Sequence, residues 1–155
     1  MPGKPRELQH QRLAKIAQTY GLKLVYLFGS LSDLGEQYYE GLHPELSDPL
    51  ADLDVGVVLL ADEMLPLERA DLYGALSIEF QELFSPFSVD LVLLEETNSV
   101  LQSEAICGKC IYYGSEELRE DYEERILARA ADFKPFLDLF YQERLEERYD
   151  KPHPH

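Results

Sequence analysis

The feature that most constrains the fold is a set of short apolar runs bordered by small or acidic residues. The run "LKLVYLF" stops at Gly29-Ser30, "LDVGVVLL" is opened by Asp52 and Asp54, and "SVDLVLL" carries Asp90 near its start. Runs of this length and composition are typical of buried strands. A buried carboxylate without a partner is costly, so acids at the mouth of such strands require water or a cation.

Helical spacing separates these runs. We expect strands over residues 22–28, 53–60, 88–94 and 110–114, and helices over residues 5–20, 65–84, 98–108 and from 115 to about 149. Gly21 is the expected helix stop, Asn98 or Ser99 the expected N-cap, and Pro135 a break or kink. This order predicts an α+β (or α/β) fold, a small mixed sheet with flanking helices.

The chain length of 155 residues fits one domain with a hydrophobic core. We expect a single domain over 1–155, with a core of about 5–114, C-terminal helices of about 115–149 and a tail over 150–155. No apolar run approaches the roughly 20 residues of a membrane span, and the N-terminus lacks the apolar stretch of a signal peptide. A cytoplasmic protein without membrane contact is the expectation.

The net charge of −16 is concentrated in the middle of the chain. Residues 24–108 hold seventeen acids and one basic residue, Arg69, whereas the remainder is balanced. Nucleic-acid binding depends on Lys and Arg that neutralise phosphates, so direct binding of nucleic acid is not expected. A nucleotide handled by this region would have to be held through bound cations.

The acidic residues of the strands form a candidate cation site. Asp52 and Asp54 share one face of their strand because side chains alternate. Asp90 comes close to them if its strand lies alongside. Mg²⁺ combines carboxylates, waters and substrate phosphates, and a strand that ends in Gly29-Ser30 allows its backbone to approach phosphate oxygens. Taken singly, each of these signals is weak, and their order along the chain is what carries the argument.

In that order, "LFGS", "DLDVGVVL" and "VDLVLL" resemble the nucleotidyltransferase core shared by DNA polymerase beta and aminoglycoside nucleotidyltransferases. The short chain is similar to the minimal nucleotidyltransferases (MNT), the antitoxins of HEPN–MNT toxin–antitoxin pairs. The resemblance implies that Gly29 and Ser30 contact the triphosphate and that Asp52, Asp54 and Asp90 hold Mg²⁺. It also implies transfer of AMP from ATP, in some members onto a tyrosine of the partner HEPN toxin.

Two other functions stay open beside this one. A chain of the same fold can act as a non-catalytic antitoxin or binding module, and a small-molecule transferase of the aminoglycoside type would suit the acidic middle of the chain. The sequence does not identify the acceptor or the base preference, and it leaves a homo-oligomer open.

The connection over residues 31–51 is longer than in the family, and "GSLSDLG" has no basic residue where the family commonly has one. This connection carries Tyr38, Tyr39 and His43, and it can be a lid, a partner-binding loop or a surface excursion without function.

Several further residues are candidates for binding or reactive sites. Lys109 and Arg69 can reach a phosphate or be solvated surface charges. Cys107 and Cys110 in "CGKC" are expected to be reduced thiols near a turn. His153 and His155 belong to the C-terminal tail, which is expected to fray. Tyr112 and Tyr113 are expected in the core or at a strand edge.

Overall fold

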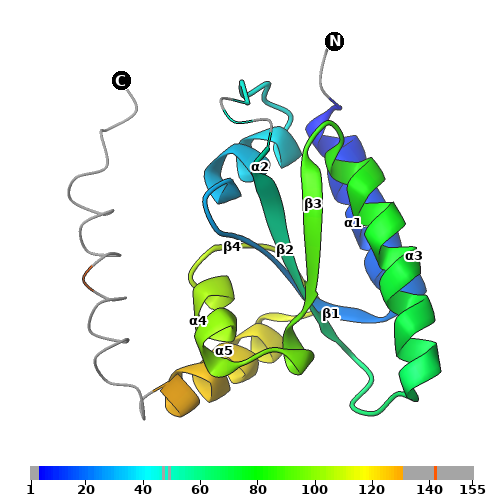
Figure 1. The fold of residues 1–155 in the computed structure, drawn as a ribbon, viewed down its shortest axis with the longest axis vertical. Helices are drawn as coiled ribbons and strands as arrows, with labels where there is room; N and C mark the ends of the chain where they lie inside the picture. The colour runs from blue at the N-terminus through cyan, green and yellow to red at the C-terminus, as the bar shows by residue number, and fades with distance from the viewer. Residues whose placement is uncertain (1–3, 47, 49, 131–141, 143–155) are drawn as a thin grey trace.

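The computed structural model describes residues 4–46, 48, 50–130 and 142. Helices flank one sheet, as Figure 1 shows. The elements, in chain order, are α1 (Arg6–Tyr20), β1 (Leu22–Phe28), α2 (Ser32–Tyr39), β2 (Asp52–Leu59), α3 (Pro66–Phe84), β3 (Ser88–Leu93), the 3-10 helix η1 (Leu94–Glu96), α4 (Ser99–Ile106), β4 (Lys109–Tyr113) and α5 (Glu116–Ala130). None of the helices in the described part of the chain is long and apolar enough to cross a membrane.

The four described strands form one mixed sheet in the order β3-β2-β1-β4, which confirms the predicted fold class. β1 is antiparallel to both β2 and β4, whereas β2 and β3 are parallel. Parallel neighbours require a crossover connection, and α3 provides it. As a result, β2 and β3 begin at the same end of the sheet, and β1 terminates at that end.

Both faces of the sheet are covered. On one face, Leu53, Val55 and Val57 of β2 join side chains of α1 and α3 in the larger core. On the other face, the buried Tyr26 and Val58 join side chains of α4 and α5 in a second core. Figure 1 shows α1 and α3 side by side on one side of the sheet and α4 and α5 on the other. Burial on both faces explains why the strands read as nearly continuous apolar runs.

The predicted helix ends are confirmed. Gly21 ends α1 with φ +68°, a left-handed conformation that glycine adopts without a steric penalty. Asn98 caps α4, since its side chain accepts a hydrogen bond of 2.9 Å from the Leu101 amide. Tyr113 lies in the edge strand β4 and is 43% exposed, while Tyr112 packs against the larger core, so both tyrosines lie where they were expected.

The connection over 31–51 differs from the prediction of a long loop, because its first part is the helix α2. Tyr38 and Tyr39 are 7% and 2% exposed and belong to the larger core, not to a surface excursion. Gly35 allows α2 to lie close to the sheet, since an added Cβ would come within 2.6 Å of Leu53 Cδ1. The glycines and prolines of the segment are typical of turns, so the sequence pattern did not predict this short helix.

The C-terminal helical prediction is confirmed for α5 alone. Pro135, the predicted helical stretch beyond Ala130 and the tail with His153 and His155 lie outside the described residues, except for residue 142. The division into a core, C-terminal helices and a tail stays a prediction.

Candidate functional site

The Gly29-Ser30 pair lies at the end of the sheet where β1 stops and α2 begins. Gly29 has φ +79°, which favours glycine over any residue with a side chain. The Ser32 amide donates to the Gly29 carbonyl at 3.3 Å, so the chain turns sharply between the strand and the helix. Both residues of the pair are exposed, and the turn is therefore accessible to a ligand at this edge.

Asp54 and Asp90 meet beside this turn. Asp54 lies opposite Phe28 on β1 and opposite Asp90 on the parallel strand β3. Desolvation, then the charges of Asp90 and Asp52, then a hydrogen bond with Asp90 raise the pKa of Asp54 to about 6. The register therefore places Asp54 beside Asp90, on the face of the sheet that α4 and α5 cover.

The turn and the carboxyl pair form one site because Gly29 lies against Asp54. A Cβ added to Gly29 would lie 2.2 Å from Asp54 Oδ2, closer than any real contact. The absence of a side chain at residue 29 thus has two consequences. It permits the positive φ, and it makes room for the Asp54 carboxylate.

Asp52 is the outlying member of the predicted triad. It is exposed, it lies opposite Ser88, and its charge contributes to the raised pKa of Asp54. Among the described residues, no three His, Cys, Asp or Glu side chains are gathered as a metal-holding group. The structure therefore brings two of the three carboxylates together and places the third on the same strand, two residues away.

The donor chemistry of the pair fits Mg²⁺. This ion is commonly held by one or two carboxylates, with waters and substrate phosphates completing the shell. The charge of Asp90 and a hydrogen bond with it contribute to the raised pKa of Asp54, and a divalent cation held by these two carboxylates would offset the same repulsion. Whether these residues bind metal or nucleotide stays a prediction.

The two basic candidates lie toward opposite ends of the sheet. Lys109 lies opposite Leu27 on β4, next to the Gly29-Ser30 turn, and its Nζ is 3.6 Å from Asp33 Oδ1. Arg69 instead lines a pocket at the other end of β2, and its Nε is 2.8 Å from Glu96 Oε1. Lys109 is therefore the one of the two at the Gly29-Ser30 end of the sheet, where it shares the face of Leu27.

Sequence reasoning missed Glu104 of α4. Its charge adds to the raised pKa of Asp54, and no motif marks it because its proximity arises only from the packing of α4 on the sheet. Cys107 and Cys110 are reduced in the described structure, as predicted. Burial raises the pKa of Cys110 to about 11, so this thiol is a poor nucleophile.

A scan against protein-family models and a search of curated proteins find no match. Solved structures, in contrast, match over most of the chain. A complex of the Shewanella oneidensis HEPN toxin, tri-AMPylated, with the MNT antitoxin matches with a TM-score of 0.53 and 19% identity, covering 90% of this chain and 98% of that one.

Two further toxin–antitoxin complexes match to a similar degree. One holds AMP-PNP, with a TM-score of 0.53, 21% identity and coverage of 88% and 98% of the two chains. The other is an MntA–HepT complex, with a TM-score of 0.52, 18% identity and coverage of 90% and 98%. At these identities the likeness concerns the fold.

Proposed function

We propose, on the premise that this chain has the nucleotidyltransferase-like α+β fold of its MntA neighbours, that it transfers AMP from ATP to a tyrosine of a partner HEPN toxin. The observation that carries the proposal is that Asp54 lies beside Asp90 in the sheet and against Gly29 of the turn. The neighbours add support, since one of those complexes contains a tri-AMPylated HEPN toxin and another contains AMP-PNP.

In this proposal each residue of the site has one role. The backbone at Gly29 and the hydroxyl of Ser30 hold oxygens of the triphosphate, and Asp54 and Asp90, with Asp52 beside them, hold Mg²⁺. When bound, this cation supplies charge neutralisation for the phosphates and for the leaving group. That charge is needed because residues 24–108 hold seventeen acids and one basic residue, which repel a polyanion.

The reaction is a balanced displacement at phosphorus. The acceptor oxygen forms a bond to the α-phosphorus, the bond from that phosphorus to the oxygen bridging to the β-phosphate breaks, and pyrophosphate leaves. The proton of the acceptor hydroxyl passes to solvent. Catalysis of this kind depends mainly on positioning and on electrostatic stabilisation, which is what a fixed turn beside fixed carboxylates can provide.

The test is label transfer from ATP labelled at the α-phosphate to a co-encoded HEPN protein in the presence of Mg²⁺. We expect wild type to transfer label, and Asp52→Asn and Asp54→Asn each to lose at least ~10²-fold in rate. Asn preserves the size of the side chain and removes one negative ligand. Asp71→Asn on the outer surface of α3, an exposed acid outside the site, is the matched control and should keep full activity.

A non-catalytic antitoxin of the same fold predicts a different outcome. The absence of a basic residue after Gly29-Ser30 favours this alternative. No label transfer by wild type, together with toxin neutralisation that both Asn variants retain, would overturn the catalytic proposal. Calorimetry with ATP adds a second reading, because binding should require Mg²⁺ or Mn²⁺ and disappear in EDTA.

A further inference from the structure

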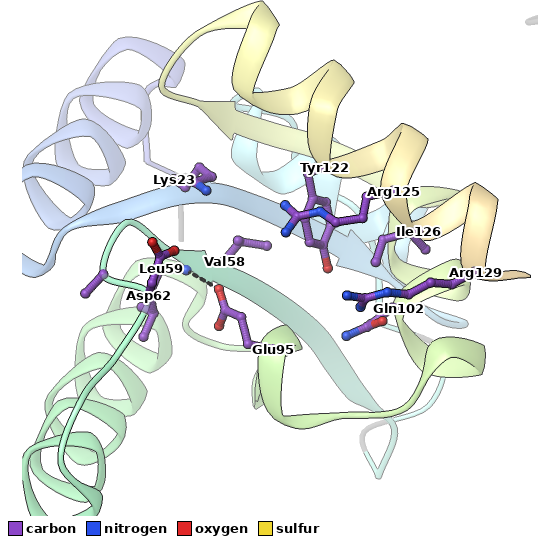
Figure 2. Close-up of a pocket in the computed structure, with 11 residues that line it drawn as sticks. Lys23, Val58, Leu59, Asp62, Glu95, Gln102, Tyr122, Arg125, Ile126 and Arg129 are labelled. Atoms are coloured by element: carbon purple, nitrogen blue, oxygen red, sulfur yellow. Dashed lines mark hydrogen bonds between the residues drawn. The ribbon is translucent and has the colours of Figure 1, made fainter.

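A second pocket lies on the face of the sheet covered by α4 and α5, at the opposite end of β2 from Asp54. Its volume is about 250 Å³. Figure 2 shows that its side chains come from β1, the end of β2, η1, α4 and α5. An adjoining hollow of about 500 Å³ shares Leu59, Asp62 and Glu95 with it. The space is therefore large enough for a small metabolite.

Three cations line this pocket in an otherwise acidic protein. They are Lys23 of β1 and Arg125 and Arg129 of α5. Among the described residues none of the three forms an ion pair, whereas Arg6, Arg69, Lys109 and Arg119 do. Arg125 and Arg129 are four residues apart on one helix and so lie on the same face. Two such guanidinium groups are suited to clamping a phosphate group.

The pocket also contains a hydroxyl group without a partner. Tyr122 is 4% exposed, and its hydroxyl oxygen is buried without a hydrogen-bond partner in the described structure. Figure 2 shows this side chain reaching from α5 into the pocket beside Arg125. Desolvation, followed by the charge of Glu95, raises the pKa of Tyr122, so the hydroxyl keeps its proton. An unsatisfied buried donor is costly, and a ligand oxygen would satisfy it.

The other end of the pocket carries acidic side chains together with Lys23. Figure 2 places Asp62 and Lys23 toward one end and Arg129 and Gln102 toward the other. The Glu95 carboxylate, which accepts a hydrogen bond of 2.7 Å from the Leu59 amide, also lines the pocket and offers acceptor oxygens. The polarity of the lining therefore matches a molecule with an anionic group at one end and hydroxyl or amino donors at the other.

We propose that this pocket binds a small phosphorylated metabolite, with the phosphate between Arg125 and Arg129 next to the Tyr122 hydroxyl. Hydroxyl groups of the ligand face Glu95 and Asp62. The site is separate from the Gly29-Ser30 end of the sheet, and the inference does not depend on the proposed transferase activity.

The test uses calorimetry in EDTA with three probes: ribose 5-phosphate, inorganic phosphate and ribose. We expect ribose 5-phosphate to bind more tightly than phosphate, and ribose not to bind measurably. Arg125→Gln and Arg129→Gln should each weaken ribose 5-phosphate about tenfold or more. Lys15→Gln, which removes one exposed cation of α1, should not change the affinity. Equal affinity in wild type and both Arg variants, or no saturable binding of either phosphate probe, would overturn the proposal.

Tyr122→Phe tests the role of the hydroxyl group without changing the charge of the pocket. Removing the unpartnered hydroxyl should raise the melting temperature of the free protein, and at the same time it should weaken ribose 5-phosphate severalfold. Because the two effects have opposite sign, a general loss of structure cannot imitate them. A variant that is less stable than wild type, or one that binds the probe as tightly, would show that the hydroxyl does not face a ligand.

Discussion

Asp54→Asn should stabilise the metal-free protein. Its neighbours and desolvation raise the pKa of Asp54 from an ordinary 3.8 to about 6. A shift of about 2 units corresponds to about 3 kcal/mol between the charged and the neutral form. Water still reaches this half-buried group, so screening reduces the figure to about 1–2 kcal/mol. The amide avoids the charge of Asp54 and can donate to Asp90.

The sign of this effect with pH follows from proton binding. Between pH 3.8 and about 6 the folded chain binds the proton of Asp54 more tightly than the unfolded chain does. Stability contributed by this proton is present below pH 3.8 and is lost as pH rises through about 6. The advantage of Asn over Asp should therefore be near zero at pH 3.5 and complete at pH 7.5.

Urea unfolding in EDTA at several pH values measures this difference. At pH 7.5 the gain of about 1–2 kcal/mol should also appear as a rise of roughly 2–8 °C in melting temperature. Asp71→Asn, at an exposed position of α3, controls for the general loss of one charge and should change stability little. A gain that is independent of pH, or an equal gain in the control, would refute the view that crowding of the Asp54 carboxylate is the cause.

Three further changes test other parts of the structure. Gly29→Ala should destabilise the protein more than Gly21→Ala, by about 1 kcal/mol or more. Both glycines have positive φ, but of the two only Gly29 would place an added Cβ against another atom. Paired urea titrations measure the difference. Lys109→Met should raise KM for ATP about tenfold, equivalent to about 1.4 kcal/mol, with a smaller effect on kcat; an unchanged KM would exclude a phosphate contact. Tyr26→Phe should destabilise by about 1–2 kcal/mol, because its hydroxyl donates to Glu123 at 3.1 Å; thermal unfolding that matches wild type would contradict this.

Local chemistry was enough to predict most elements of the fold. The apolar runs that became β1 and most of β2 could be recognised because strands buried on both faces read as nearly continuous apolar sequence, and β3 could be recognised by its apolar second half. Gly21 and Asn98 marked helix ends because their roles depend only on backbone conformation and on a short side chain. The position of Gly29-Ser30 at the end of a strand was predictable for the same reason.

Pairing between distant segments decided the rest. Asp54 and Asp90 are 36 residues apart in the sequence and become neighbours only because β2 and β3 are parallel and in register. Strand order and register depend on which faces can be buried together, and this is a property of the whole sheet. The sequence therefore suggested the three acids as candidates, while tertiary structure decided that Asp54 lies beside Asp90 and against Gly29 and that Asp52 stays apart.

The same distinction holds at the far end of β2. In the sequence, Arg125 and Arg129 belong to an amphipathic helix rich in charge, and nothing separates them from the arginines that form ion pairs. Their position beside the Tyr122 hydroxyl, in a pocket that Lys23 lines at its other end, arises because α5 packs across the second core of the sheet. Sequence patterns determine which face of a helix is apolar. The side chains that meet beside that face depend on the elements that the fold packs against the helix.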